Sequence, residues 1–191
     1  MRAGLGLLAF AALLVLTACS STTVYVPANI PANFSRIVSG LKSAVTETQN
    51  DLAGEQRDIN MGASNQAGTC VNLVANVDYD VTIIIGQDRR NVIDERNNLE
   101  VAIAAVRQDI TDWQNDVQAI ANQGVPPPSD ESSVISSAYT EILMALNEAN
   151  GDIDQANTYI HQAYSMANAL ASGTCAGHGP GGEPGNIGQL S

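Results

Sequence analysis

The sequence predicts an all-α fold, an elongated three-helix bundle in which a long antiparallel helical hairpin is closed by a disulfide. Three observations support this prediction. Aromatic residues make up 4% of the chain, and Ala, Asn, Gln, Asp and Ile dominate between the prolines, a composition typical of helices. Apolar residues recur at alternating steps of four and three, as the buried side of a helix requires. Two cysteines, Cys70 and Cys175, lie at similar distances from a central run of prolines.

The first predicted helix runs from Asn33 or Ser35 to about Gly62. Its apolar residues return at helical spacing: Phe34, Ile37, Val38, Leu41, Val45, Leu52 and Ile59. Turn-forming residues from Ser64 to Gly68 then separate it from the next helix.

The second predicted helix begins near Cys70 and ends before Gly124. Its clearest part steps by four and three through Leu99, Ile103, Val106, Ile110, Trp113, Val117 and Ile120. The same steps continue upstream through Cys70, Val74, Val77, Val81 and Ile84. The β-branched run 81–85 is also compatible with a strand, but the chain offers no similar partner strand, so we favour helix. Gly124 and the prolines at 126–128 end it, because proline lacks an amide donor.

The third predicted helix is capped by Ser129 or Asp130 and ends at Gly173. Its apolar positions repeat every seven residues on two lines, one of Ile135, Ile142, Ala149, Ala156, Ala163 and Leu170, the other of Tyr139, Leu146, Ile153, Ile160 and Ala167. The small alanines favour close approach of two helix axes. Gly151 costs about 1 kcal/mol relative to alanine in a helix, so a local bend is expected there.

Cysteine spacing provides a geometric test of the hairpin. If the second and third helices fold back near residue 126, Cys70 lies 56 residues before the hinge and Cys175 lies 49 after it. At about 1.5 Å per residue the two arms differ by about 10 Å, which the end of the third helix can absorb. A disulfide between them would close a loop of about 105 residues and contribute roughly 4 to 5 kcal/mol in the chain-entropy model. The alternative is two unrelated buried thiols.

The first 18 residues have the features of an export signal. Arg2 precedes an uncharged apolar stretch from Leu5 to Leu16, too short to span a hydrocarbon core of about 30 Å. The residues Leu16-Thr17-Ala18-Cys19 resemble the lipobox of bacterial lipoproteins. The resemblance implies that the Cys19 thiol receives a diacylglyceryl group and that cleavage before Cys19 makes it the first mature residue. Two acyl chains give durable attachment, whereas one alone is reversible. An ordinary secretory signal with a chance cysteine is the alternative.

The chain therefore divides into four predicted segments: a signal peptide (1–18), a lipidated flexible tether (19–32), a helical bundle (33–175) and a tail (176–191). Residues 20–31 are uncharged and contain two prolines, which indicates an extended tether. The tail holds six glycines and two prolines, so we expect it to be disordered.

Charge limits the partners of the mature chain. The full chain has a formal net charge of −12, and removing Arg2 with the signal leaves seven basic residues against twenty acidic ones, near −13. Such a surface repels phosphate backbones, so nucleic acid is not an expected partner. It also disfavours lying flat on anionic lipid. We expect an exported protein held at the bacterial membrane or outer membrane by lipid on Cys19, facing the periplasm or exterior, with a protein partner of undetermined identity.

Motifs for catalysis, cofactors and metals are absent from the sequence. It has no Gly-x-Ser-x-Gly elbow, phosphate-binding glycine loop, His-Glu-x-x-His or Cys-x-x-Cys, and we expect no enzyme activity, cofactor or metal. His161 and His178 are the only histidines, and neither has a second ligand at metal-binding spacing. Trp113 lies on the apolar side of its helix, which favours a packing role, with a partner-binding anchor as the alternative.

Two functional hypotheses follow. The first is a non-enzymatic helical interaction or spacer module at the cell envelope, with the hairpin tip from Val125 to Ser136 as the contact region. The second is a lipoprotein that binds a cell-wall or small-molecule ligand, or assists an enzyme, through the polar interruption from Asp88 to Arg96. Its candidate residues are Arg89, Arg90, Asp94 and Arg96. Arg90 with Asp94, and Arg96 with Glu100, also have the spacing of helical ion pairs.

Overall fold

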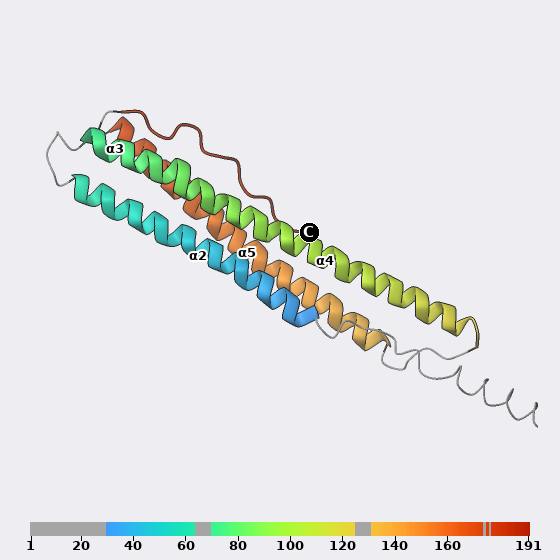
Figure 1. Ribbon diagram of the computed structural model, residues 1–191. Helices are drawn as coiled ribbons and strands as arrows, with labels where there is room; N and C mark the ends of the chain where they lie inside the picture. The colour runs from blue at the N-terminus through green and yellow to red at the C-terminus, as the bar shows by residue number, and fades with distance from the viewer. Residues whose placement is uncertain (1–29, 64–69, 125–130, 174, 176) are drawn as a thin grey trace, which may run out of the picture.

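The protein is an elongated bundle of helices (Figure 1). The computed structural model describes residues 30–63, 70–124, 131–173, 175 and 177–191. Its elements are α2 (Ile30–Ala63), α3 (Cys70–Tyr79), the π-helix η1 (Asp80–Ile85), α4 (Gly86–Ala121) and α5 (Glu131–Ser172). The predicted all-α class is confirmed. The predicted signal peptide, Cys19, most of the tether and the prolines of the hairpin turn lie outside the described residues.

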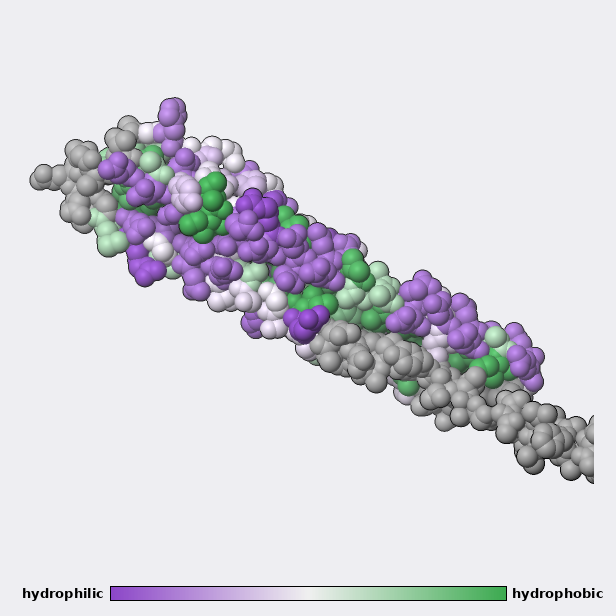
Figure 2. All heavy atoms as spheres, in the orientation of Figure 1, coloured by the Kyte–Doolittle hydropathy of each residue, from purple (hydrophilic) through white to green (hydrophobic). Residues whose placement is uncertain are grey.

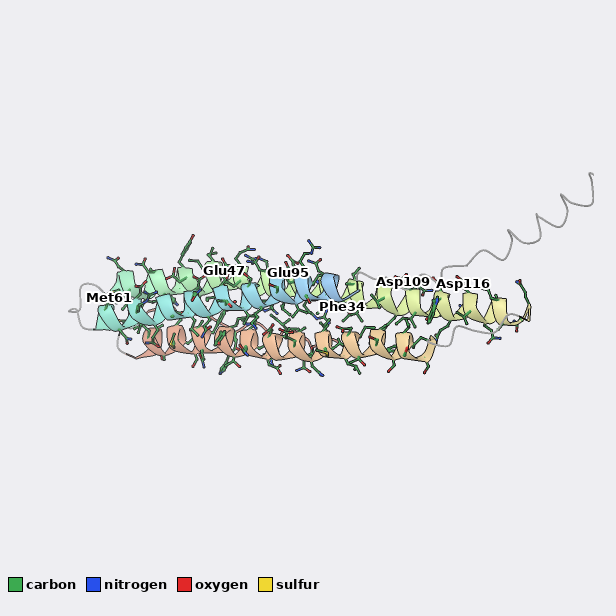
Figure 3. All side chains as sticks on the ribbon, turned by 90° about the horizontal axis from the view of Figure 1, so that it is seen from below. Phe34, Glu47, Met61, Glu95, Asp109 and Asp116 are labelled. Atoms are coloured by element: carbon green, nitrogen blue, oxygen red, sulfur yellow. A yellow bond between two sulfur atoms is a disulfide. The ribbon has the colours of Figure 1, made fainter. Side chains whose placement is uncertain are left out.

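The bundle has three arms that lie side by side: α2, a second arm made of α3, η1 and α4, and α5 (Figure 1). The chain runs in the same direction along α2 and α5, and antiparallel to both along α3, η1 and α4 (Figure 1). Packing of α2 against both α4 and α5 is more extensive than packing of α4 against α5. Phe34 and Met61 mark the two ends of α2, and Asp109 and Asp116 lie where α4 extends past Phe34 (Figure 3). The predicted hairpin is therefore present, and α2 packs against both of its arms.

The core follows the predicted seams closely. Ala149, Ala156 and Ala163 are fully buried, as expected for helices that approach closely. The larger core residues are Leu41 of α2, Val77, Val81, Ile85, Val92 and Leu99 of the second arm, and Ile142 and Ile153 of α5. Tyr139 departs from the prediction, since it is 43% exposed. The helix α5 continues through Gly151. The face shown in Figure 2 is largely hydrophilic, with separate hydrophobic patches.

A π turn joins α3 to α4 and corrects the predicted register. Residues 81–85 are helical, as favoured, and the flanking residues Tyr79 and Gly86 keep right-handed helical dihedrals. The predicted seam passed through Ile84, but Ile84 is 37% exposed and Ile85 is 1% exposed. Two successive steps of four, from Val77 to Val81 to Ile85, exceed the 3.6-residue period, and a π turn accommodates the excess. The seam then continues through Asp88, a position that the sequence analysis treated as part of a polar interruption.

The disulfide between Cys70 and Cys175 is present, with the two Cα atoms 5.1 Å apart and a sequence separation of 105 residues. It joins the first residue of α3 to the chain just beyond α5. The backbone beyond α5 is also held by hydrogen bonds from the N–H of Cys175 to the carbonyl oxygen of Leu170, at 3.1 Å, and from Gly177 to Ala171, at 3.0 Å. At this end of the bundle, α3 is therefore joined covalently to the chain that follows α5.

The expectation of a disordered tail is wrong for residues 177–191, which we call the strap. The strap leaves the disulfide end and runs back along the bundle in an extended path (Figure 1). Ile187 and Leu190 are 4% and 6% exposed and belong to the hydrophobic core. The glycines and prolines do prevent a regular element, but side chains of α4 and α5 supply hydrogen-bond partners for the strap backbone. Within the described residues, no helix combines the length and apolar character needed to cross a membrane.

Candidate functional site

Two asparagines of α5 bind the backbone of the strap in the same way. Asn157 donates from Nδ2 to the carbonyl oxygen of Ile187 at 3.1 Å, and its Oδ1 accepts from the Ile187 N–H at 2.8 Å. Asn150 makes the equivalent pair with Leu190, at 3.1 and 2.8 Å. Each amide thus satisfies both polar groups of one strap residue. Because a buried peptide group without partners is costly, these pairs allow an irregular segment to lie against the core.

Three arginines of α4 bind strap carbonyl oxygens from the opposite side. Arg89 donates to the carbonyl of Gly185 at 2.8 Å, and Arg96 donates to the carbonyls of Gly188 and Gln189 at 2.9 and 3.3 Å. Arg107 donates to the carbonyl of Ser191 at 3.3 Å. We call the set Arg89, Arg96, Arg107, Asn150 and Asn157 the strap site.

A simple register relates the helices to the strap. Asn150 and Asn157 are seven residues apart on α5, which is about 10.5 Å at 1.5 Å per residue. They bind strap residues three apart, which span about 10 Å in an extended chain. Arg89 and Arg96 show the same ratio on α4, seven residues for the three between Gly185 and Gly188. A heptad of each helix therefore matches three residues of extended peptide.

Further side-chain contacts hold the strap nearer the disulfide and at its end. His161 Nδ1 and Glu183 Oε2 are 2.8 Å apart, and Asn168 donates to the carbonyl of Gly181 at 3.3 Å. Gln189 donates to both carboxylate oxygens of Asp154, at 3.0 and 3.1 Å. The His161 side chain is exposed at this contact.

The predicted polar site is divided by the structure. Arg89 and Arg96 bind the strap, whereas Arg90 turns along its own helix and donates to Gln87 Oε1 at 2.8 and 3.1 Å. Asp94 is exposed, and the expected pair with Arg90 is replaced by this contact with Gln87. The second expected pair is present, with Arg96 and Glu100 2.6 Å apart.

Trp113 lies on the buried side of α4 and is 7% exposed, as its packing role requires. Its Nε1 lacks a hydrogen-bond partner. The ring is therefore not presented to a partner as an exposed anchor.

A second polar cluster, which the sequence analysis missed, lies between α2 and the second arm. We call it the acidic seam: Glu47, Asp51, Glu55 and Asp58 of α2 facing Asp80 of η1 and Asp88 of α4. Glu55 is 2% exposed and Asp88 is 3% exposed. Both oxygens of Glu55, and Oδ2 of Asp88, have no hydrogen-bond partner. The missed signal was the double step of four before Ile85, which turns Asp88 inward.

The acidic seam favours bound protons. Burial raises the pKa of Glu55 from 4.5 to about 8, and the nearby Asp80 adds to the increase. Burial likewise raises the pKa of Asp88 from 3.8 to about 7, assisted by the charge of Asp51, by a hydrogen bond between the two carboxyl groups, and by Glu47. Burial is also the main reason that the pKa of Asp80 is raised, with Asp58 and Asp51 contributing. Each named influence on these three groups raises the pKa, so each protonated form is stabilised relative to its ionised form.

Neither a search for metal-binding groups among the described residues nor comparison with known proteins adds a further site. In the part of the chain that the structure describes, no group of three or more His, Cys, Asp or Glu residues is arranged to hold a metal ion. Comparison of the chain with protein-family models, curated proteins and solved structures finds no significant match. The strap site and the acidic seam are therefore the two features from which a function can be argued.

Proposed function

We propose that this protein is an exported bacterial lipoprotein, anchored through Cys19, that acts as a non-enzymatic helical interaction module at the cell envelope. The single observation that carries the proposal is the division of labour among its three cysteines. Cys70 and Cys175 form a disulfide, which needs an oxidising compartment to persist. The remaining cysteine, Cys19, directly follows Leu16-Thr17-Ala18, the sequence that resembles a lipobox.

The fold supports a role in contact rather than in catalysis. An elongated bundle presents a long surface for its size, and apart from the acidic seam most of its buried residues are apolar. The alternative function, ligand binding at the polar segment from Asp88 to Arg96, is less favoured because Arg89 and Arg96 already bind the strap. Binding of a cell-wall or small-molecule ligand at that segment would require the strap to leave first.

The proposal is tested by expressing the full chain in a bacterial host and measuring intact mass in the membrane fraction. The expected species begins at Cys19 and carries acyl mass, and alkylation at Cys70 and Cys175 occurs only after reduction. The Cys19→Ser variant should lose the acyl mass and the membrane attachment. The Cys70→Ser variant is the matched control, since it removes the disulfide and should keep the anchor. A wild-type chain found in the cytosol with residues 1–18 intact would overturn the proposal.

A further inference from the structure

We propose that the strap site binds extended peptide segments of other proteins, and that residues 183–191 occupy it as an intramolecular competitor. The inference rests on the interaction role proposed above and names the class of its partner. That partner is an extended segment, neutral or acidic, with two apolar side chains three residues apart.

The strap site contacts the main chain of its occupant. All five of its side chains bond to backbone groups of the strap, and two of them, Asn150 and Asn157, take both the N–H and the C=O of one residue. Such contacts are available to any peptide of the same extended shape. Because seven residues of each helix match three residues of extended peptide, successive side chains of the site meet successive main-chain groups of an extended chain of any sequence.

Selection for apolar side chains falls on two positions. Ile187 and Leu190 are buried among core residues, whereas the intervening Gly188 and Gln189 are exposed. The occupant therefore needs an apolar residue, two exposed positions, of which the second can donate to Asp154 as Gln189 does, and a second apolar residue. Three of the eight Lys and Arg residues of this acidic chain donate to main-chain oxygens of the occupant, so a cationic side chain of the peptide is disfavoured beside these three contacts.

The strap is a weaker occupant than the site permits. A Cβ atom added at Gly185 or Gly188 would meet nothing within 4 Å, so neither glycine is required by the site. Glycine loses more conformational freedom on ordering than other residues do. A peptide with other residues at these two positions avoids that cost. The strap offsets it by being tethered, which gives it a high effective concentration.

The strap can leave without opening the bundle. The glycines nearest the disulfide pack closely against helix side chains: a Cβ at Gly177 would lie 3.0 Å from Val74 Cγ1, and one at Gly179 would lie 2.5 Å from Asn168 Oδ1. These two positions, together with the disulfide at Cys175, belong to the closed end of the bundle. Beyond them, the added Cβ at Gly181, Gly182, Gly185 and Gly188 meets nothing within 4 Å. Release from residue 181 onward therefore leaves the disulfide end intact.

The test uses the full chain with Ile187→Asp and Leu190→Asp, which expels the strap, and a fluorescent peptide with the sequence of residues 182–191 carrying alanine in place of Gly185 and Gly188. We expect saturable one-to-one binding by fluorescence anisotropy, with an apparent affinity at least tenfold higher for the released variant than for wild type. Adding Asn157→Ala to the released variant should weaken binding about tenfold, because two hydrogen bonds are lost. A peptide with aspartate at both apolar positions is the matched control and should not bind.

Absence of binding to a released variant that keeps its helical circular dichroism and its disulfide would overturn the proposal. If the released variant does not fold, hydrogen exchange of the wild type gives a second test. The amides of Ile187 and Leu190 should then exchange at least tenfold faster than those of Ala149 and Ala156, and equal protection would refute a strap that leaves separately. Both assays use the purified chain, so their failure is distinguishable from a failure of membrane anchoring, which is measured by mass.

Discussion

Replacing Glu55 by glutamine should remove most of the pH dependence of stability that this carboxyl group creates. Glu55 is 2% exposed, and neither of its oxygens has a hydrogen-bond partner. Its principal charged neighbour is Asp80, whose carboxylate opposes ionisation of Glu55. Glutamine keeps the shape of the protonated acid and cannot ionise.

The expected magnitude follows from linkage. The pKa of Glu55 rises from 4.5 to about 8 on folding, so the folded state holds a proton that the unfolded state releases. The stability that Glu55 contributes is therefore fully present below pH 4.5 and is lost as the pH rises towards 8. At about 1.4 kcal/mol for each pH unit, the loss is about 3 kcal/mol at pH 7 and about 5 kcal/mol above pH 8. That is a large share of the 5 to 15 kcal/mol typical of folded proteins.

The assay is urea unfolding of wild type and Glu55→Gln at pH 5, 7 and 8.5. The two proteins should differ by about 1 kcal/mol or less at pH 5, and the variant should be more stable by several kcal/mol at pH 8.5. Glu100→Gln is the matched control, because Glu100 is exposed and pairs only with Arg96 at the surface, which contributes little. Parallel pH profiles for wild type and Glu55→Gln would refute the reasoning.

Four further predictions follow from the structure. Asp88→Asn should stabilise the protein at pH 8 and change it little at pH 4, because burial raises the pKa of Asp88 to about 7; urea titrations at both pH values check this. Gly151→Ala should raise the free energy of unfolding by about 1 kcal/mol, since an added Cβ meets nothing within 4 Å in this helix, and a lowered value would contradict it. Gly179→Ala should accelerate hydrogen exchange of the strap amides, because the new Cβ would lie 2.5 Å from a side-chain oxygen; unchanged exchange rates would count against it. Replacing Cys70 and Cys175 by alanine should cost about 4 kcal/mol, seen as a lower melting temperature that reductant no longer affects.

The helices and the disulfide could be predicted because their determinants are local or nearly one-dimensional. The steps of four and three around Leu99 and Trp113 depend on neighbours within a turn or two. The pairing of Cys70 with Cys175 followed from the hinge position and the rise per residue, with Cys19 assigned to the lipid anchor. Even the alanine seam of α5 was visible as a heptad repeat, because each buried position is repeated at the same phase of the helix.

The acidic seam and the strap could not be found in this way. Asp88 is a charged residue of the kind usually found at the surface. It is buried because the π turn shifts the seam from Ile84 to Ile85. A local sequence pattern shows that Asp88 is charged. Whether its side chain is buried depends on the helical register set by the preceding helix. The sequence analysis therefore assigned Asp88 to a polar interruption, and the structure places it beside Asp51.

The sequence by itself determined where the chain is helical, because backbone hydrogen bonds within a helix join residues four apart. Given those helices, the distances of Cys70 and Cys175 from the proline run determined which two cysteines meet. Tertiary structure alone decided that the glycine-rich tail is ordered. Its peptide groups find no partners among their own neighbours, and a count of glycine and proline predicts disorder. Asn150 and Asn157 of one helix, with Arg89 and Arg96 of another, supply those partners only after the two helices have been brought together along the strap.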